Sequence, residues 1–143
     1  FIDYGAFSDC ANLTTVIMNE GLKTIGENVF CNCSNLKSIT IPDSVISIEQ
    51  GLFALCLGLK SVTIGNSVIS IGEKAFWGCD SLTNVTIDSA TIAGLGSSYC
   101  KLLDSATKVY VKTGLTVGTY ITNSFTKAAS SDKAGYDMYT KKA

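Results

Sequence analysis

The chain contains no histidine and no arginine, and it has one proline and one tryptophan among its 143 residues. Without histidine, the Ser–His and Cys–His pairs that activate a nucleophile cannot form within the chain. Without arginine, it lacks the bidentate fork with which many proteins recognise phosphate and guanine. We therefore expect neither an enzyme built on a histidine base nor a nucleic-acid binding protein.

Charge and long apolar runs are also scarce, with only 16% of the residues charged. The longest uncharged apolar stretch, 52–59, is far too short to span a membrane, so we expect no membrane insertion by this segment. Residues 1–100 carry four lysines and nine acids, giving a net charge of −5, whereas residues 101–143 carry seven lysines and three acids, giving +4. We interpret the lysine excess as a solvated surface. The 46% of hydrophobic residues predicts one domain with a continuous core.

What the chain does have is a period of 23 residues. Three residue types recur at this spacing: Phe7, Phe30, Phe53 and Phe76; Cys10, Cys33, Cys56 and Cys79; Leu13, Leu36, Leu59 and Leu82. A fixed period of this length indicates stacked copies of one unit that cannot bury its apolar face alone. Because the chain begins with Phe1 in the middle of such a unit, we expect it to be a fragment.

Each repeat contains a segment in which β-branched residues alternate with small polar ones. These segments are 37–41, 60–64 and 83–87, and 14–18 matches them in phase. Alternation of this kind predicts a half-buried strand, with valine and isoleucine facing the core and serine, threonine and asparagine facing out. Stacking the copies would place the strands side by side in a parallel sheet, one strand per repeat.

Two further segments complete the predicted unit. Residues 45–48 and 68–71 are apolar-rich and predict a short extended segment on the opposite side of the core. A bend at the phase of Gly26 and Gly72 then leads into a mixed stretch such as 73–77. We expect about one helical turn there, with the phenylalanine pointing inward between the two sides.

The frame resembles the leucine-rich repeat family, and within it the BspA-like subclass. Residues 71–87 follow the subclass pattern I-G-x-x-A-F-x-x-C-x-x-L-x-x-V-x-I nearly throughout, and residues 41–45 supply its I-P-x-S-V element. Glu49 replaces glycine, Leu52 replaces alanine, and Gly65 and Asp88 replace proline. The resemblance covers about residues 1–92. It implies a β-rich solenoid of mixed α/β type, wound as a right-handed superhelix. It also implies a cell-surface or secreted protein that binds host or matrix proteins.

The register fails after Ile87, so we divide the chain into an array of repeats (1–91) and a degenerate last repeat with a C-terminal cap (92–143). Residues 108–112 predict one last strand, shifted by about one residue. Residues 116–126 predict a short helix, with Val117, Tyr120, Ile121 and Phe125 facing the array. Residues 135–140 alternate weakly and predict a final strand.

Candidate chemical sites are few. Four of the six cysteines form one row at the edge of the core, and we expect free, buried thiols there, although rungs about 5 Å apart would also allow disulfides. Cys31-Asn32-Cys33 brings only two sulfurs together, so we predict no metal site and no cofactor. Glu27, Gln50 and Glu73 recur near the bend, and we interpret them as a solvated face. No catalytic residue is assigned.

Two surface rows remain as candidates for binding a protein partner. The first is the outward strand face, with Thr15, Ile17, Ser38, Thr40, Ser61, Thr63, Asn84 and Thr86. Threonine and serine also simply suit an exposed sheet, so this row has a purely structural explanation. The second row is Ile46, Ile69 and Ile92, which would mark an interface if it faces outward, and neighbouring rungs would partly cover it otherwise.

We predict a non-enzymatic protein for recognition or adhesion, with the strand face as its contact surface. The alternative is a structural scaffold, intracellular or filament-associated, that has no dedicated ligand site. A carbohydrate-binding or hydrolytic module is disfavoured because Trp77 is the only tryptophan and no aromatic platform is evident. The sequence leaves the oligomeric state and the identity of the partner open.

Overall fold

The computed structural model describes residues 1–89, 102–103, 106–115, 121 and 124–143. Within them it contains short strands joined by turns. The strands are β1 (Ser38–Ile41), β2 (Ser47–Ile48), β3 (Ser61–Ile64), β4 (Ser70–Ile71), β5 (Asn84–Ile87), β6 (Lys108–Lys112), β7 (Phe125–Lys127) and β8 (Tyr136–Lys141).

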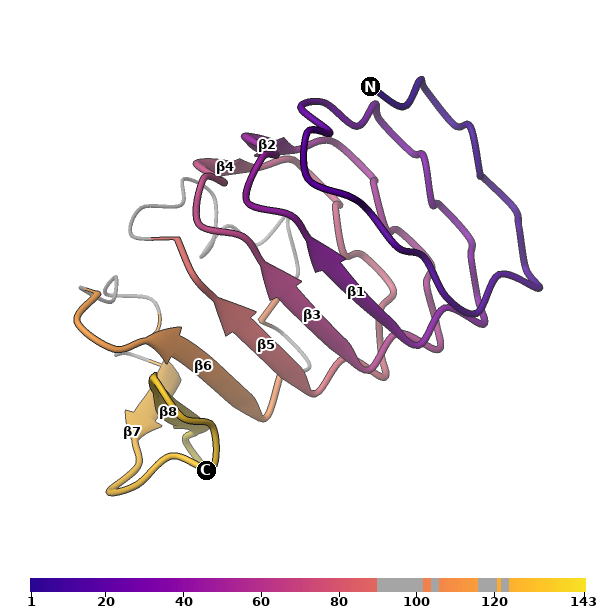
Figure 1. The fold of residues 1–143 in the computed structure, drawn as a ribbon. Helices are drawn as coiled ribbons and strands as arrows, with labels where there is room; N and C mark the ends of the chain where they lie inside the picture. Colours follow the sequence, from indigo (N-terminus) through magenta and orange to yellow (C-terminus); the bar gives the residue numbers. More distant parts are fainter. Residues whose placement is uncertain (90–101, 104–105, 116–120, 122–123) are drawn as a thin grey trace.

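Strands β1, β3, β5 and β6 run parallel, side by side along one side of the molecule (Figure 1). The offset between paired residues is 23 from Ser38 to Ser61, and 24 from Asn84 to Lys108. The predicted one-residue shift of the last repeat strand is therefore confirmed. In β1, Ile39 and Ile41 are buried whereas Ser38 and Thr40 are exposed, as the alternating pattern predicts.

A second, two-stranded parallel sheet lies across the core from β1 and β3 (Figure 1). It pairs β2 with β4, so that Ile48 lies beside Ile71. Both side chains are buried, and they close the core opposite the main sheet. The second extended segments predicted at residues 45–48 and 68–71 are confirmed by β2 and β4.

The stretch between this second sheet and each repeat cysteine differs from the prediction, because it forms successive turns and no helix. Asn28 and Asn32 have positive φ angles, as do Lys74 and Gly78 at the same two positions of a later repeat. Residues with a left-handed backbone conformation at every fourth position interrupt a helix. They also direct alternate backbone amides toward the next coil. The amide of Phe53, for example, donates a hydrogen bond to the carbonyl of Ala75 at 2.8 Å.

The phenylalanines form a stacked column through the core. The rings of Phe7 and Phe30 have centroids 5.6 Å apart, those of Phe30 and Phe53 also 5.6 Å, and those of Phe53 and Phe76 5.4 Å. This spacing lies in the favourable range for aromatic pairs. The inward orientation predicted for these residues is confirmed for Phe30, Phe53 and Phe76, which are fully buried.

The main sheet ends in an antiparallel hairpin formed by β7 and β8, at the opposite end of the molecule from the first coils (Figure 1). Strand β8 confirms the strand predicted for residues 135–140. The predicted helix 116–126 is wrong at its end, because Phe125 begins β7. Ile121 is helical and buried, whereas Val117 and Tyr120 lie outside the described residues.

Residues 14–18 match the strand pattern but form no strand. One hydrogen bond, from the amide of Lys37 to the carbonyl of Thr14 at 3.4 Å, links this segment to the residue before β1. Nearby, Ile2 and Ile25 form an isolated bridge. The segment has a neighbouring coil on one side only, so half of the ladder that would hold it extended is missing.

Candidate interaction surface

The outward face of the main sheet, which we call the strand face, consists of small uncharged side chains in register. Ser61 pairs with Ser38 on one side and with Asn84 on the other, and Thr40 pairs with Thr63. Ser38, Thr40 and Asn84 are exposed, while Ser61 and Thr63 are half-buried. The pairing places these residues in two rows across β1, β3 and β5. Figure 1 shows these strands side by side.

Thr86 continues the second row but is not accessible, which corrects the expectation from the sequence. Its side chain is only 7% exposed. The ammonium group of Lys133, between β7 and β8, donates a hydrogen bond to Oγ1 of Thr86 at 3.0 Å. The C-terminal hairpin therefore covers this end of the strand face.

Thr15 and Ile17 lie at the other end, in the segment that forms no strand. Both are exposed, and Ile17 is 82% exposed. Because no strand pairing fixes this segment against β1, the structure does not join these two residues to the regular rows of the strand face.

Charged residues border the strand face on two sides, a feature that the repeated outward positions in the sequence do not predict. Lys37 and Lys60 are exposed just before β1 and β3. Asp43 is exposed in the turn after β1, where its carboxylate accepts hydrogen bonds from the backbone and side-chain amides of Asn66 at 2.8 and 3.0 Å. The strand face thus lies between a basic border at Lys37 and Lys60 and an acidic border at Asp43, whose carboxylate already accepts two hydrogen bonds.

The second candidate row faces outward on the two-stranded sheet side. Ile46 is 51% exposed and Ile69 55% exposed, and the amide of Ile69 donates to the carbonyl of Ile46 at 2.9 Å. Lys23 occupies the same repeat position one coil earlier. Ile92 lies outside the described residues. The described apolar row is therefore two residues long.

The cysteine row is built into the core edge by hydrogen bonds. The thiols of Cys33 and Cys56 donate to the carbonyls of Phe7 and Phe30, each at 3.2 Å, and Cys79 donates to Phe53 at 3.1 Å. The five described cysteines are free, as predicted, although Cys10 is exposed rather than buried. Cys100 lies outside the described residues.

Burial also makes these thiols unreactive. It raises the pKa of Cys33 to about 11 and that of Cys79 to about 12, and it raises the pKa of Cys56 strongly. A thiolate is the nucleophile and the metal ligand, so these residues suit packing better than chemistry. Within the described part of the chain, no group of three or more histidine, cysteine or acidic residues is placed to hold a metal ion.

Glu27, Gln50 and Glu73 are exposed, as a solvated face requires. A hydrogen bond to Asp88, together with burial, raises the pKa of Tyr136 to about 12. Among the residues that the structure describes, no helix is long and apolar enough to cross a membrane.

A family model described as BspA type Leucine rich repeat region matches residues 1–128 in six copies. The chain belongs to this family. The match to BspA-type repeats continues past residue 92, where the resemblance recognised in the sequence ends, and includes β6.

A solved structure of a leucine-rich repeat protein from Bacteroides ovatus ATCC 8483 is similar to this BspA-type chain, with 37% identity and a TM-score of 0.53. The similarity covers 63% of this chain and 26% of that one, so the chain spans about a quarter of the length of that protein. No curated protein matches the chain.

The BspA-type family suggests a repeat protein that interacts with other proteins. Proteins of this family and fold are generally non-enzymatic, and members of the BspA type are typically found on the cell surface.

Proposed function

We propose that this chain is a non-enzymatic recognition module of a cell-surface or secreted protein, and that it binds a protein partner, as in adhesion, through the strand face. The observation that carries the proposal is the register of β1, β3 and β5, which lines up Ser38, Ser61 and Asn84, and Thr40 with Thr63, as accessible polar groups. Repeat proteins use such extended faces for recognition. Because the sheet is already ordered, little conformational entropy is lost on binding.

The division of the chain supports the same proposal. Residues 1–91 would form the array that presents the strand face, wound in a right-handed sense, as the family resemblance implies. Residues 92–143 would supply the last repeat and the cap. The hairpin of β7 and β8 fits the role of a cap, because it pairs with β6 and covers Thr86.

The contact surface is tested with a double variant, Thr40→Lys with Thr63→Lys, applied to immobilised extracellular-matrix and host-cell surface proteins. Two ammonium groups at the centre of the strand face would leave partner polar groups unpaired and weaken binding at least tenfold. The matched control is Ile46→Lys with Ile69→Lys, which adds the same charge at two exposed positions outside the strand face. Loss of binding in the control alone would assign the interface to the isoleucine row.

The localisation is tested by labelling intact source cells with a membrane-impermeant amine reagent and then probing for this chain. Labelling before lysis is expected, because lysines such as Lys37 and Lys60 are exposed. Protection until lysis, together with no binding to any immobilised protein, would favour the intracellular scaffold and reject the adhesion proposal.

A further inference from the structure

We propose that Thr86, Tyr110 and Tyr136 form a site for the ammonium group of a lysine, and that the partner of the strand face inserts such a lysine there. In the free chain Lys133 fills the site. Lys133 belongs to the connection between β7 and β8, residues 128–135, here called the hairpin loop. The role of the partner rests on the proposed function, whereas the site itself is defined by contacts within the chain.

The site lies where the outward rows of the strand face continue onto β6 and β8. Tyr110 is in register with Thr86 in β5 and with Met138 in β8. Tyr136 begins β8 and pairs with Lys112. Figure 1 shows β6 and the hairpin next to β5 at this end of the sheet. The threonine row of the strand face therefore leads to two half-buried phenol rings.

The ammonium group of Lys133 has three neighbours that suit a positive charge. It lies 4.1 Å from the centre of the Tyr136 ring and 5.8 Å from the centre of the Tyr110 ring. Both distances are within the range of a cation–π contact. The third neighbour is Oγ1 of Thr86, which accepts a hydrogen bond at 3.0 Å. A hydroxyl oxygen accepts from neutral and charged donors alike, but two ring faces favour a cation.

A carboxylate beside the site adds to its preference for positive charge. The hydroxyl group of Tyr136 is hydrogen-bonded to Asp88, which directly follows β5. Oδ1 of Asp88 is buried and has no hydrogen-bond partner among the residues that the structure describes. A buried carboxylate oxygen without a donor is unfavourable, and a cation close by offsets part of that cost. The surroundings of Tyr136 therefore favour an occupied site.

The hairpin loop is held in place by polar contacts alone. None of its residues is buried, and it has no apolar side chain larger than alanine. Its ion pair, between Asp132 and Lys108, joins side chains that are 56% and 40% exposed. Exposed ion pairs of this kind contribute little to stability, and segments with few buried contacts open at low free-energy cost. A partner can therefore displace the loop while the core stays folded.

The loop also indicates what the partner should carry next to its lysine. Asp132, the residue before Lys133, pairs with the ammonium group of Lys108 at 2.9 Å. It also accepts a hydrogen bond from the hydroxyl group of Tyr110. A partner that displaces the loop removes this acceptor from both groups, which weakens binding unless the partner replaces it. The partner segment that fits best therefore has an acidic residue directly before the inserted lysine.

The site is tested with Lys133→Ala and n-butylammonium, which has the charge and shape of the end of a lysine side chain. The neutral control is n-butanol at the same ionic strength. In the variant, we expect n-butylammonium to shift the ring NMR signals of Tyr110 and Tyr136 at concentrations at least roughly fivefold lower than n-butanol, because only the cation attracts the rings. In the parent chain Lys133 should prevent these shifts. Equal shifts with both compounds, or in both proteins, would overturn the proposal.

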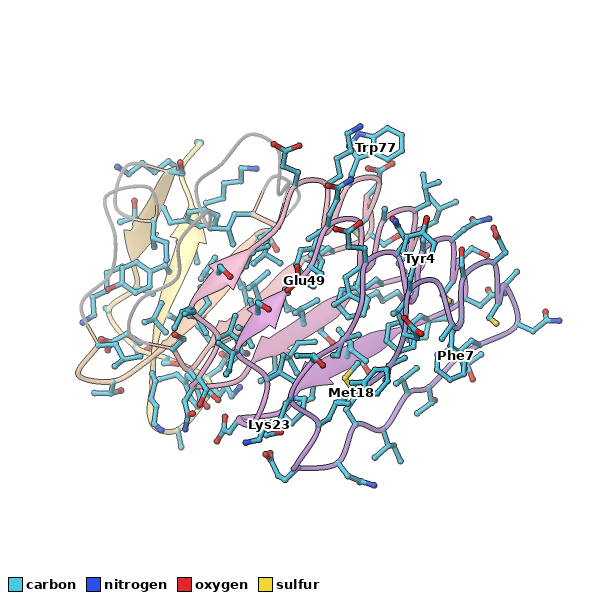
Figure 2. The ribbon with its side chains drawn as sticks, turned by 90° about the horizontal axis from the view of Figure 1, so that it is seen from above. Tyr4, Phe7, Met18, Lys23, Glu49 and Trp77 are labelled. Carbon is cyan, nitrogen blue, oxygen red and sulfur yellow. The ribbon has the colours of Figure 1, made fainter. Side chains whose placement is uncertain are left out.

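Displacement of the loop is tested with the same immobilised extracellular-matrix and host-cell surface proteins. Lys133→Ala should strengthen binding roughly tenfold, because the partner's lysine no longer competes with the loop for the site. The matched control is Lys23→Ala, which removes the same charge from an exposed position on an early coil. Figure 2 shows Lys23 apart from the yellow strands of the hairpin. An equal gain in the two variants would overturn the proposal, since it would reflect net charge alone.

A further variant separates the lysine site from simple uncovering of the strand face. Tyr110→Leu, added to Lys133→Ala, keeps an apolar side chain but removes one ring, so it should reverse most of the gain. A retained gain would overturn the proposal. If Thr40→Lys with Thr63→Lys abolishes binding while Lys133→Ala leaves it unchanged, the proposed function stands and the partner's lysine is rejected. Binding of no protein by any variant would reject both, and the n-butylammonium result would decide on the site itself.

Discussion

The ammonium group of Lys133 lies 3.0 Å from Oγ1 of Thr86 and 4.1 Å from the centre of the Tyr136 ring, so one side chain ties the C-terminal hairpin to the strand face. A charged hydrogen bond and a cation–π contact each contribute on the order of 1 kcal/mol. We expect Lys133→Ala to lower the free energy of unfolding by about 1–2 kcal/mol, measured by urea denaturation.

The control for this prediction is Lys112→Ala. Lys112 is exposed at the end of β6, and its ammonium group forms no ion pair with any residue that the structure describes. Its replacement should change the free energy of unfolding by less than about 0.5 kcal/mol. An equal loss in the two variants would mean that the Lys133 contacts do not hold the hairpin.

The phenylalanine column predicts a graded response along the array. Phe53 is fully buried between two rings, whereas Phe7 has a ring on one side and is 43% exposed. Phe53→Ala should cost about 3–5 kcal/mol, because it removes the ring and leaves a cavity. Phe7→Ala should cost less than half as much. Thermal and urea unfolding would measure both, and equal losses would show that the first coil is as well packed as the centre.

The sequence was sufficient to predict the repeating part of the fold because every copy must bury the same alternate strand residues in the core. Ile39, Val62 and Val85 face the core in adjacent strands, so their spacing predicts both the strand and its neighbour. The shift of β6 was also predictable, since Val109 and Val111 keep the alternation one residue late. Periodicity therefore located the parallel strands and their register.

Local patterns were insufficient where contacts between coils decide the conformation. The stretch 73–77 has residues compatible with a helical turn, but Lys74 takes a positive φ so that its neighbours can bond to the preceding coil. Phe125 fits a helix in the isolated sequence, yet β8 recruits it into β7. The burial of Thr86 depends on Lys133, 47 residues away, and no repeat pattern encodes that contact.

The raised pKa values of the buried thiols predict that the fold loses stability in alkali. A thiol whose pKa is higher in the folded state keeps its proton there while the unfolded chain releases it. This contribution is complete below the ordinary value of 9.0 and is lost as pH rises toward the folded values, about 11 for Cys33 and about 12 for Cys79. Each such thiol should lower the free energy of unfolding by about 1.4 kcal/mol per pH unit in that range.

Cys79→Ser isolates one of these contributions. Serine keeps a hydroxyl donor for the Phe53 carbonyl but does not ionise in this range. Between about pH 9.5 and pH 11, the decline in unfolding free energy of the variant should be shallower than that of the parent by about 1.4 kcal/mol per pH unit. Parallel curves for Cys79→Ser and its parent would contradict the assignment.

The residues with positive φ, which lie between the two-stranded sheet and each repeat cysteine, offer a way to stabilise the array. Lys74 has φ of 55°, at a position that Gly5 and Gly51 occupy in other coils. A side chain in this region costs about 1–2 kcal/mol relative to glycine, and the greater flexibility of glycine in the unfolded chain offsets about half of that. We expect Lys74→Gly to raise the free energy of unfolding by up to about 1 kcal/mol. The control is Lys60→Gly, at an exposed position without a positive φ. This change should lower the free energy of unfolding, because glycine relieves no backbone strain there. Destabilisation by both changes in thermal unfolding would show that the Lys74 side chain contributes more than its backbone costs.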